Sequence, residues 1–195
     1  MYTCTNCQRQ LVNKMSLNEL KDKVINWHMY RYPGIDNTPA EKSLNAINRL
    51  CSDILFPIQD EFGAVKITYG FTSHTLLKNI QKLSPNHIAP NLDQHASYEL
   101  NSRGNSICSR GGAACDIFVP KFETNMYVIA KWAAENLPFD RMYLYGSGRP
   151  IHLSFGPDNM RFIQVMKTNT EGKRFPGKRG TYKEFSTIIG DVDER

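Results

Sequence analysis

The sequence predicts one α+β domain in which a small, mainly antiparallel β-sheet is packed by helices. Two helical patterns come first, strand patterns follow them, and a late helix lies among the strands, an order typical of this class. The length of 195 residues, of which 41% are hydrophobic, provides a sizeable core for one domain. Neither an internal repeat nor a low-complexity tract interrupts the pattern.

Two amino-terminal helices are predicted from their starting signals. A capping box at residues 16–19 begins a helix that extends to about residue 31, where Tyr32-Pro33-Gly34 stops it. A second capping box, at residues 38–41, has a proline at the first helical position. The apolar spacing of this second helix continues to Leu55, and Pro57 is expected to bend or end it.

Strands are predicted where apolar and polar residues alternate or form a short apolar run, at residues 65–69, 117–119, 140–145 and 151–155. A short helix is expected from Ser73 or His74 onward, and residues 126–137 have the apolar spacing of a longer helix that packs on the sheet. The polar segment that follows Pro85 is predicted to be a loop that delivers His95.

Three potential metal ligands, His95, Asp116 and His152, lie in separate segments. Small residues at positions 111–114 would let backbone and metal approach closely, and Asp116 is expected at the mouth of the sheet. His152 falls on the polar face of its strand, so it is available for a site. Two imidazoles and one carboxylate, with a fourth position left for water, are typical of catalytic zinc. Taken singly, each residue is more commonly a surface or hydrogen-bonding group.

Several motifs occur in order between about residues 44 and 157: Leu55-Phe56-Pro57, Phe62-Gly63, Gln94-His95, Gly112-x-Ala114-x-Asp116 and Ile151-His152-Leu153-Ser154. Together they resemble the zinc D-alanyl-D-alanine carboxypeptidase family, whose fold the hedgehog signalling domain shares. The resemblance implies a hedgehog/DD-peptidase-like core, with Zn²⁺ bound by His95, Asp116 and His152. It also implies a zinc-dependent hydrolase that cleaves an amide bond in a peptide or peptidoglycan-like substrate.

Three departures from the family pattern bear on this activity. An insertion, about residues 96–110, separates the first two ligands, where it is expected to cover or reshape the site. Thr72 stands where the family has the arginine that pairs with the substrate carboxylate, and Arg149 stands where it has its acidic general base. Glu99 and Asp158 are the acidic residues nearest in sequence that would replace this base.

The substitutions leave two interpretations of the site open. Arg149 is a candidate to hold a carboxylate or phosphate, with Thr72 and Ser154 beside it as further substrate-binding candidates; its alternative is a surface salt bridge. The protein as a whole is either the zinc-dependent hydrolase or a catalytically inactive metal-binding module for protein or nucleic-acid interaction.

Both ends of the chain lie outside the predicted core of residues 16–160. Residues 1–15 contain Cys4-x-x-Cys7, which is half of a zinc ribbon, so this pair is either two free thiols or part of a second metal site. The odd total of five cysteines favours reduced thiols over a disulfide framework. The sequence has neither a long apolar span nor an export leader, so a cytoplasmic protein without membrane contact is expected.

The carboxy-terminal extension, residues 161–195, carries much of the formal net charge of +5. Aromatic residues are interleaved among its basic ones, which are Lys167, Lys173, Arg174, Lys178, Arg179 and Lys183. Such a tail either binds the phosphate backbone of nucleic acid or forms a solvated loop and a final helix, residues 182–189, that covers the sheet edge.

Overall fold

The computed structural model describes residues 14–83 and 89–190, and it has the α+β architecture expected from the sequence. The helices are α1 (Leu17–Asn26), α2 (Glu41–Leu50), the π-helical turn η1 (Cys51–Leu55), α3 (Phe56–Phe62), α4 (His74–Leu83), the short η2 (Pro120–Phe122), α5 (Tyr127–Asn136), η3 (Tyr182–Glu184) and α6 (Phe185–Ile189). The strands are β1 (Lys66–Tyr69), β2 (Ala113–Phe118), β3 (Arg141–Leu144), β4 (Ile151–Phe155), β5 (Phe162–Thr168) and β6 (Arg174–Thr181).

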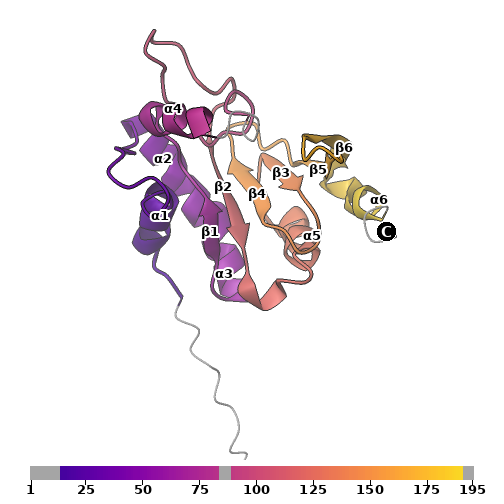
Figure 1. The fold of residues 1–195 in the computed structure, drawn as a ribbon. Helices are drawn as coiled ribbons and strands as arrows, with labels where there is room; N and C mark the ends of the chain where they lie inside the picture. The colour runs from indigo at the N-terminus through magenta and orange to yellow at the C-terminus, as the bar shows by residue number, and fades with distance from the viewer. Residues whose placement is uncertain (1–13, 84–88, 191–195) are drawn as a thin grey trace, which may run out of the picture.

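The strands form one six-stranded sheet in the order β1-β2-β4-β3-β5-β6 (Figure 1). Every neighbouring pair is antiparallel except β3 and β5. The basic carboxy-terminal segment, expected as an extension packed on the core, supplies β5 and β6 to this sheet. The prediction missed both strands. Residues 174–181 form an edge strand, whereas one interpretation expected a solvated loop there. The final helix packs on the core through the buried side chains of Phe185 and Ile188.

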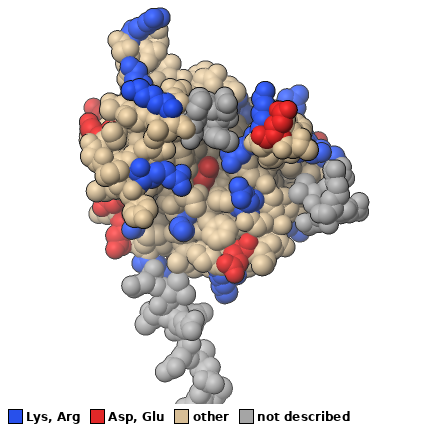
Figure 2. Space-filling view, in the orientation of Figure 1, with Lys and Arg blue, Asp and Glu red and all other residues tan. Residues whose placement is uncertain are grey.

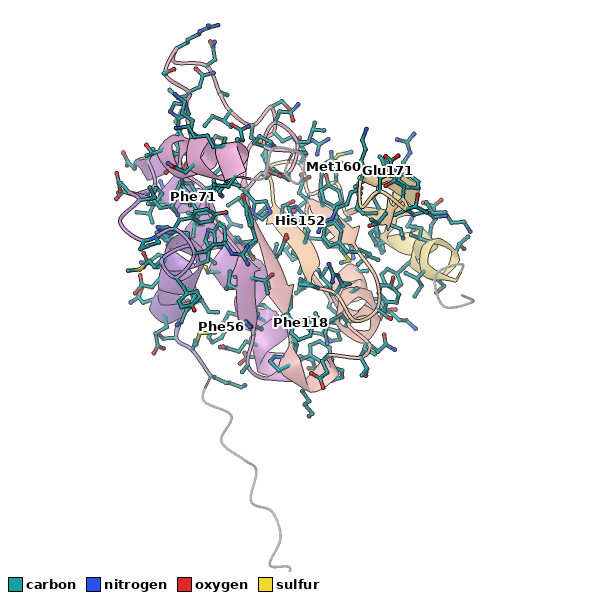
Figure 3. The ribbon with its side chains drawn as sticks, in the orientation of Figure 1. Phe56, Phe71, Phe118, His152, Met160 and Glu171 are labelled. Carbon is teal, nitrogen blue, oxygen red and sulfur yellow. The ribbon has the colours of Figure 1, made fainter. Side chains whose placement is uncertain are left out.

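The two faces of the sheet differ in chemistry. One face presents apolar residues to the core, among them Cys115, Ile117, Ile151 and Leu153, and α2 packs on β2 and β4. The alternate positions on the same strands carry Asp116 and His152. In Figure 3, His152 lies near the centre of the sheet, between Phe71 on the α1 side and the β5–β6 hairpin that carries Glu171. The period-two alternation therefore separates the core from a polar face.

Helix α1 ends at Asn26, about five residues before the predicted end, because tertiary contacts occupy its last carbonyl groups. The Phe71 backbone N–H donates to the Val24 carbonyl at 2.9 Å. The Asn37 side-chain amide donates to the Ile25 carbonyl at 2.7 Å. These acceptors are the ones that the next helical turn would need. The contacts tie the end of α1 to the loop that follows β1.

The second predicted helix continues through Pro57 to Phe62 as α2, η1 and α3. A proline inside a helix removes a backbone donor, and the preceding wide turn accommodates this loss, since the Phe56 N–H donates to the Cys51 carbonyl. The predicted capping box at residues 38–41 does not form. Instead, Ala40 occupies the capping position, and its N–H donates to Glu99 Oε1 at 2.9 Å.

Three cysteines, Cys51, Cys108 and Cys115, are buried and free, as reduced thiols were expected to be. Cys4 and Cys7 lie outside the described residues, so the second metal site stays a prediction. None of the helices in residues 14–83 and 89–190 combines the length and the apolar character needed to cross a bilayer.

Gly112 is required by the close approach of β4, which gives a testable prediction. Its φ is +117°, and a Cβ at this position would lie 1.9 Å from the Phe155 carbonyl oxygen. We expect Gly112→Ala to lower the free energy of unfolding by about 3 kcal/mol or more, measured by urea denaturation.

Gly104→Ala is the matched control for this substitution. Gly104 also has positive φ, at +78°, but a Cβ there would meet nothing within 4 Å. We therefore expect only the left-handed backbone cost of about 1–2 kcal/mol. Equal destabilisation by the two alanines would show that the backbone conformation, and not the approach of β4, requires glycine at position 112.

Candidate metal centre

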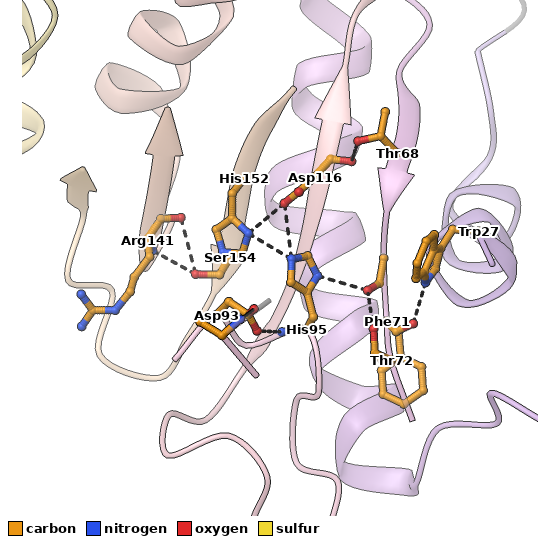
Figure 4. Close-up of polar contacts among 12 residues, drawn as sticks. Trp27, Thr68, Phe71, Thr72, Asp93, His95, Asp116, Arg141, His152 and Ser154 are labelled. Atoms are coloured by element: carbon orange, nitrogen blue, oxygen red, sulfur yellow. Dashed lines mark hydrogen bonds and ion pairs between the residues drawn. The ribbon is translucent and has the colours of Figure 1, made fainter. Parts of the chain in front are cut away.

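The three predicted ligands converge in the structure, although they come from segments far apart in the sequence (Figure 4). His152 Nδ1 lies 2.9 Å from Asp116 Oδ1 and 3.1 Å from His95 Nε2. The distance from His95 Nε2 to Asp116 Oδ1 is 3.3 Å. The three atoms thus form a compact triangle, the arrangement that the sequence predicts for a shared metal ion.

The size of this triangle is close to that of a tetrahedral site for a first-row divalent ion, although two of its three sides are shorter. Bonds of about 2.0–2.1 Å in tetrahedral geometry place ligand atoms about 3.3–3.4 Å apart. His95 Nδ1 contacts the Gly70 carbonyl at 3.1 Å, so the neutral ring carries its proton there and presents a lone pair at Nε2. His152 turns Nδ1 toward the same point, while its buried Nε2 has no hydrogen-bond partner among the described residues. The three atoms face one another, so a cation between them would bind all three once both rings are neutral.

Asp116 and His152 are positioned by strand register. They are direct partners in the antiparallel β2–β4 pair, and Asp116 lies within β2 instead of at the mouth of the sheet, which corrects the sequence-based expectation. The next strand places Tyr143 opposite His152, where the two rings stack with centroids 4.7 Å apart. The two ligands on the sheet are therefore held by the backbone ladder and by an aromatic neighbour.

His95 is held by a loop that makes hydrogen bonds on both sides of it. The Thr72 N–H donates to the His95 carbonyl at 3.0 Å, and the His95 N–H donates to Asp93 Oδ1 at 3.3 Å. The ring also packs edge-on against Tyr69, with a centroid distance of 4.5 Å. These contacts fix both the backbone and the imidazole.

The residues around His95 adopt strained backbone conformations. Gln94 and Ser97 have φ values of +60° and +46°, which are unusual for residues other than glycine. The Gln94 side-chain amide donates to the Gly111 carbonyl at 2.6 Å, and the Ser97 hydroxyl donates to the Gly112 carbonyl. The loop that carries His95 is therefore anchored by hydrogen bonds to the carbonyl groups of the two glycines before β2.

The electrostatics of the cluster keep Asp116 ionised. Burial acts to raise the pKa of Asp116, but hydrogen bonds and charge interactions with His152 and His95 outweigh it and hold the pKa well below its usual range. Burial acts to lower the pKa of His95, and the opposing hydrogen bond and charge of Asp116 raise it above its ordinary value. A divalent cation would therefore compete with a proton for the His95 ring.

The ligands lie in a cavity of about 290 Å³ on the polar face of the sheet. Figure 2 shows this face, with lysine and arginine side chains gathered around a hollow that contains recessed acidic atoms. The described residues that line the cavity are Arg31, Tyr32, Tyr69, Ile80, Asp93, His95, Asp116, Tyr145, His152 and Arg174. Burial raises the pKa values of Tyr69 and Tyr145 well above the ordinary range, so both phenols stay protonated.

Both acids proposed from the sequence lie away from this cavity. Glu99 caps the start of α2 through Ala40, and Asp158 is exposed in the turn after β4. None of the described residues 96–110 lines the cavity, so the insertion does not cover it in this conformation. Its last residue, Arg110, donates to the Leu92 carbonyl and to the Tyr143 hydroxyl, which links the insertion to the sheet.

The three substrate-binding candidates also lie outside the described lining of the cavity. Arg149 is exposed in the turn between β3 and β4. Thr72 is buried, and its backbone N–H supports His95. Ser154 is buried in β4, where its hydroxyl accepts a hydrogen bond from the Arg141 N–H at 3.0 Å. The contacts cited for Thr72 and Ser154 are structural ones.

Sequence reasoning missed three charged residues that line the cavity: Asp93, Arg31 and Arg174. Asp93 stands two residues before His95, and this proximity is a signal that could have found it. Arg31 and Arg174 are remote from every ligand in the sequence, and only the fold brings them together. Comparisons with protein-family models, curated proteins and solved structures find no match to this chain.

Proposed function

We propose that the protein is a zinc-dependent hydrolase that cleaves an amide bond in a peptide or peptidoglycan-like substrate. The convergence of His95, Asp116 and His152 in an open cavity carries this proposal. Two imidazole nitrogens and one carboxylate oxygen are a donor set that zinc prefers, and three protein ligands leave room for water or substrate. We further propose that the α+β fold is of the hedgehog/DD-peptidase type, on the strength of the motifs around these ligands.

A zinc ion in this site would polarise the scissile carbonyl group and lower the pKa of the attacking water. Within the proposal, Asp93 accepts a proton from that water, because it is the carboxylate among the described lining residues that is not itself one of the three ligands. The protonated phenols of Tyr69 and Tyr145 are available to donate hydrogen bonds to the substrate. This assignment replaces Glu99 and Asp158 as the source of the base.

The proposal is tested by metal analysis of the purified protein, followed by assays on peptidoglycan fragments and N-acylated dipeptides. We expect about one zinc per chain and hydrolysis that a chelator abolishes and added zinc restores. An oligonucleotide serves as the comparison substrate. Stoichiometric zinc without turnover would favour the catalytically inactive metal-binding module. Hydrolysis that is unaffected by complete metal removal would contradict the proposed function.

A further inference from the structure

The metal cavity has an arginine on each of two different walls. Arg31 follows α1, and its neighbour Tyr32 packs edge-on against Trp27, with centroids 6.4 Å apart. Trp27 in turn packs against Tyr69 of β1, at 4.2 Å. Tyr32 and Tyr69 line the β1 side of the cavity, and Trp27 packs against both of them.

The second wall is built by residues near β3 and β6, which lie on the other side of the ligand strands from β1 in the strand order. Arg174 begins β6, and its guanidinium lies 4.6 Å from the centroid of the Tyr145 ring, which follows β3. The two ligands on the sheet belong to β2 and β4, which lie between β1 and β3 in the strand order. The metal ligands are therefore situated between the wall with Arg31 and the wall with Arg174.

Neither guanidinium is neutralised within the described residues. In this part of the chain, the ion pairs and side-chain hydrogen bonds include no acceptor for Arg31 or Arg174. The two carboxylates that line the cavity have other contacts, since Asp116 contacts both histidines and Asp93 accepts hydrogen bonds from the Ala89 and His95 N–H groups. Two arginine side chains thus line the cavity with their donors available to a ligand.

We propose that the cavity binds a short substrate with two oxyanion groups, one at Arg31 and one at Arg174, and with the bond to be cleaved between them. A guanidinium binds a carboxylate or a phosphate through two parallel hydrogen bonds. The cavity volume of about 290 Å³ is at the small end for ligand pockets, which suits a short segment that carries both groups. The position of the cleaved bond rests on the proposed function, whereas the binding of the dianion does not.

The test measures binding by titration calorimetry, on zinc-loaded and on chelator-treated protein. The probes are linear α,ω-dicarboxylates from glutarate to azelate, each paired with the monocarboxylate of equal chain length. We expect one dicarboxylate length to bind about tenfold or more tightly than its monocarboxylate, with a preference that added salt weakens. The corresponding α,ω-diphosphonates distinguish a phosphate-bearing substrate from a carboxylate-bearing one by which series binds more tightly.

Arg31→Gln and Arg174→Gln are each expected to remove the preference for the dicarboxylate while leaving zinc content unchanged. Arg149→Gln is the matched control, because Arg149 is exposed and lies outside the cavity lining. Thermal denaturation checks that Arg174→Gln, which loses the contact with Tyr145, remains folded. The proposal is overturned if neither a dicarboxylate nor a diphosphonate binds more tightly than the monoanion of equal chain length, or if Arg149→Gln weakens binding as much as the cavity variants do.

These outcomes are distinguishable from failure of the proposed function. Selective dianion binding in a protein that hydrolyses none of its amide substrates would support the binding site and refute the hydrolase. Chelator-sensitive hydrolysis of a neutral amide, without any preference for dianions, would support the hydrolase and refute the dianion site.

Discussion

Replacing Asp116 by asparagine is expected to lower the affinity for zinc by more than about 100-fold. In structural zinc sites with four protein ligands, a binding energy of about 10–16 kcal/mol amounts to about 3 kcal/mol for each ligand. Asparagine loses the negative charge as well. The substitution keeps the size of the side chain and one oxygen atom. Zinc affinity is measured by competition with a chromogenic chelator, and chelator-sensitive hydrolysis is expected to disappear with the bound metal.

His152→Gln is expected to reduce zinc affinity to a similar extent, because it removes the Nδ1 ligand atom from the triangle.

Asp158→Asn is the matched control for Asp116→Asn, since Asp158 is exposed and lies outside the described lining of the cavity. This control should bind zinc as the unaltered protein does. Unaltered zinc affinity in folded Asp116→Asn would contradict the assignment of the metal centre to these three residues.

The three candidate ligands were predicted from the family resemblance together with local sequence patterns, and the structure brings them together. The alternation in residues 151–155 assigned His152 to the polar face of a strand, and the structure confirms both the strand and its bounds. The small residues before Asp116 were interpreted as leaving space for a metal. In the structure, Gly112 makes space for the Phe155 carbonyl group of β4. The interpretation that a small residue is needed at this position was therefore right, but the group that needs the space is the β4 backbone.

The remaining errors have physical causes that lie outside any local pattern. Strand β6 has exposed basic residues, Pro176 and two glycines, so it lacks the alternation by which strands are recognised, and only pairing with β5 makes it a strand. Helix α1 ends early because Phe71 and Asn37 occupy its carbonyl groups. Such long-range contacts also create the cavity, which explains why Arg31 and Arg174 were missed.

Replacing Asp93 by asparagine is expected to lower kcat by about 100-fold or more while leaving zinc content unchanged. General-base catalysis contributes factors of about 10²–10⁴, and an amide cannot accept the proton. Asparagine retains an oxygen for the hydrogen bond from the His95 N–H but cannot also accept the one from the Ala89 N–H, so the zinc content also checks that the loop keeps its position. The measurements are kcat, KM and zinc stoichiometry on the substrate identified by the hydrolysis assays.

If zinc is lost together with kcat, the loss of activity reflects displacement of the His95 ligand, because Asp93 also supports the backbone of His95. Retained zinc with low kcat and unchanged KM indicates that the missing function is proton transfer. Asp93→Glu should then recover part of kcat, since it restores a carboxylate, whereas Asp158→Asn should leave kcat unchanged. If Asp93→Asn keeps its zinc and hydrolyses substrate at nearly the original rate, the base is not Asp93, and the described lining leaves only the ligand Asp116 as a carboxylate.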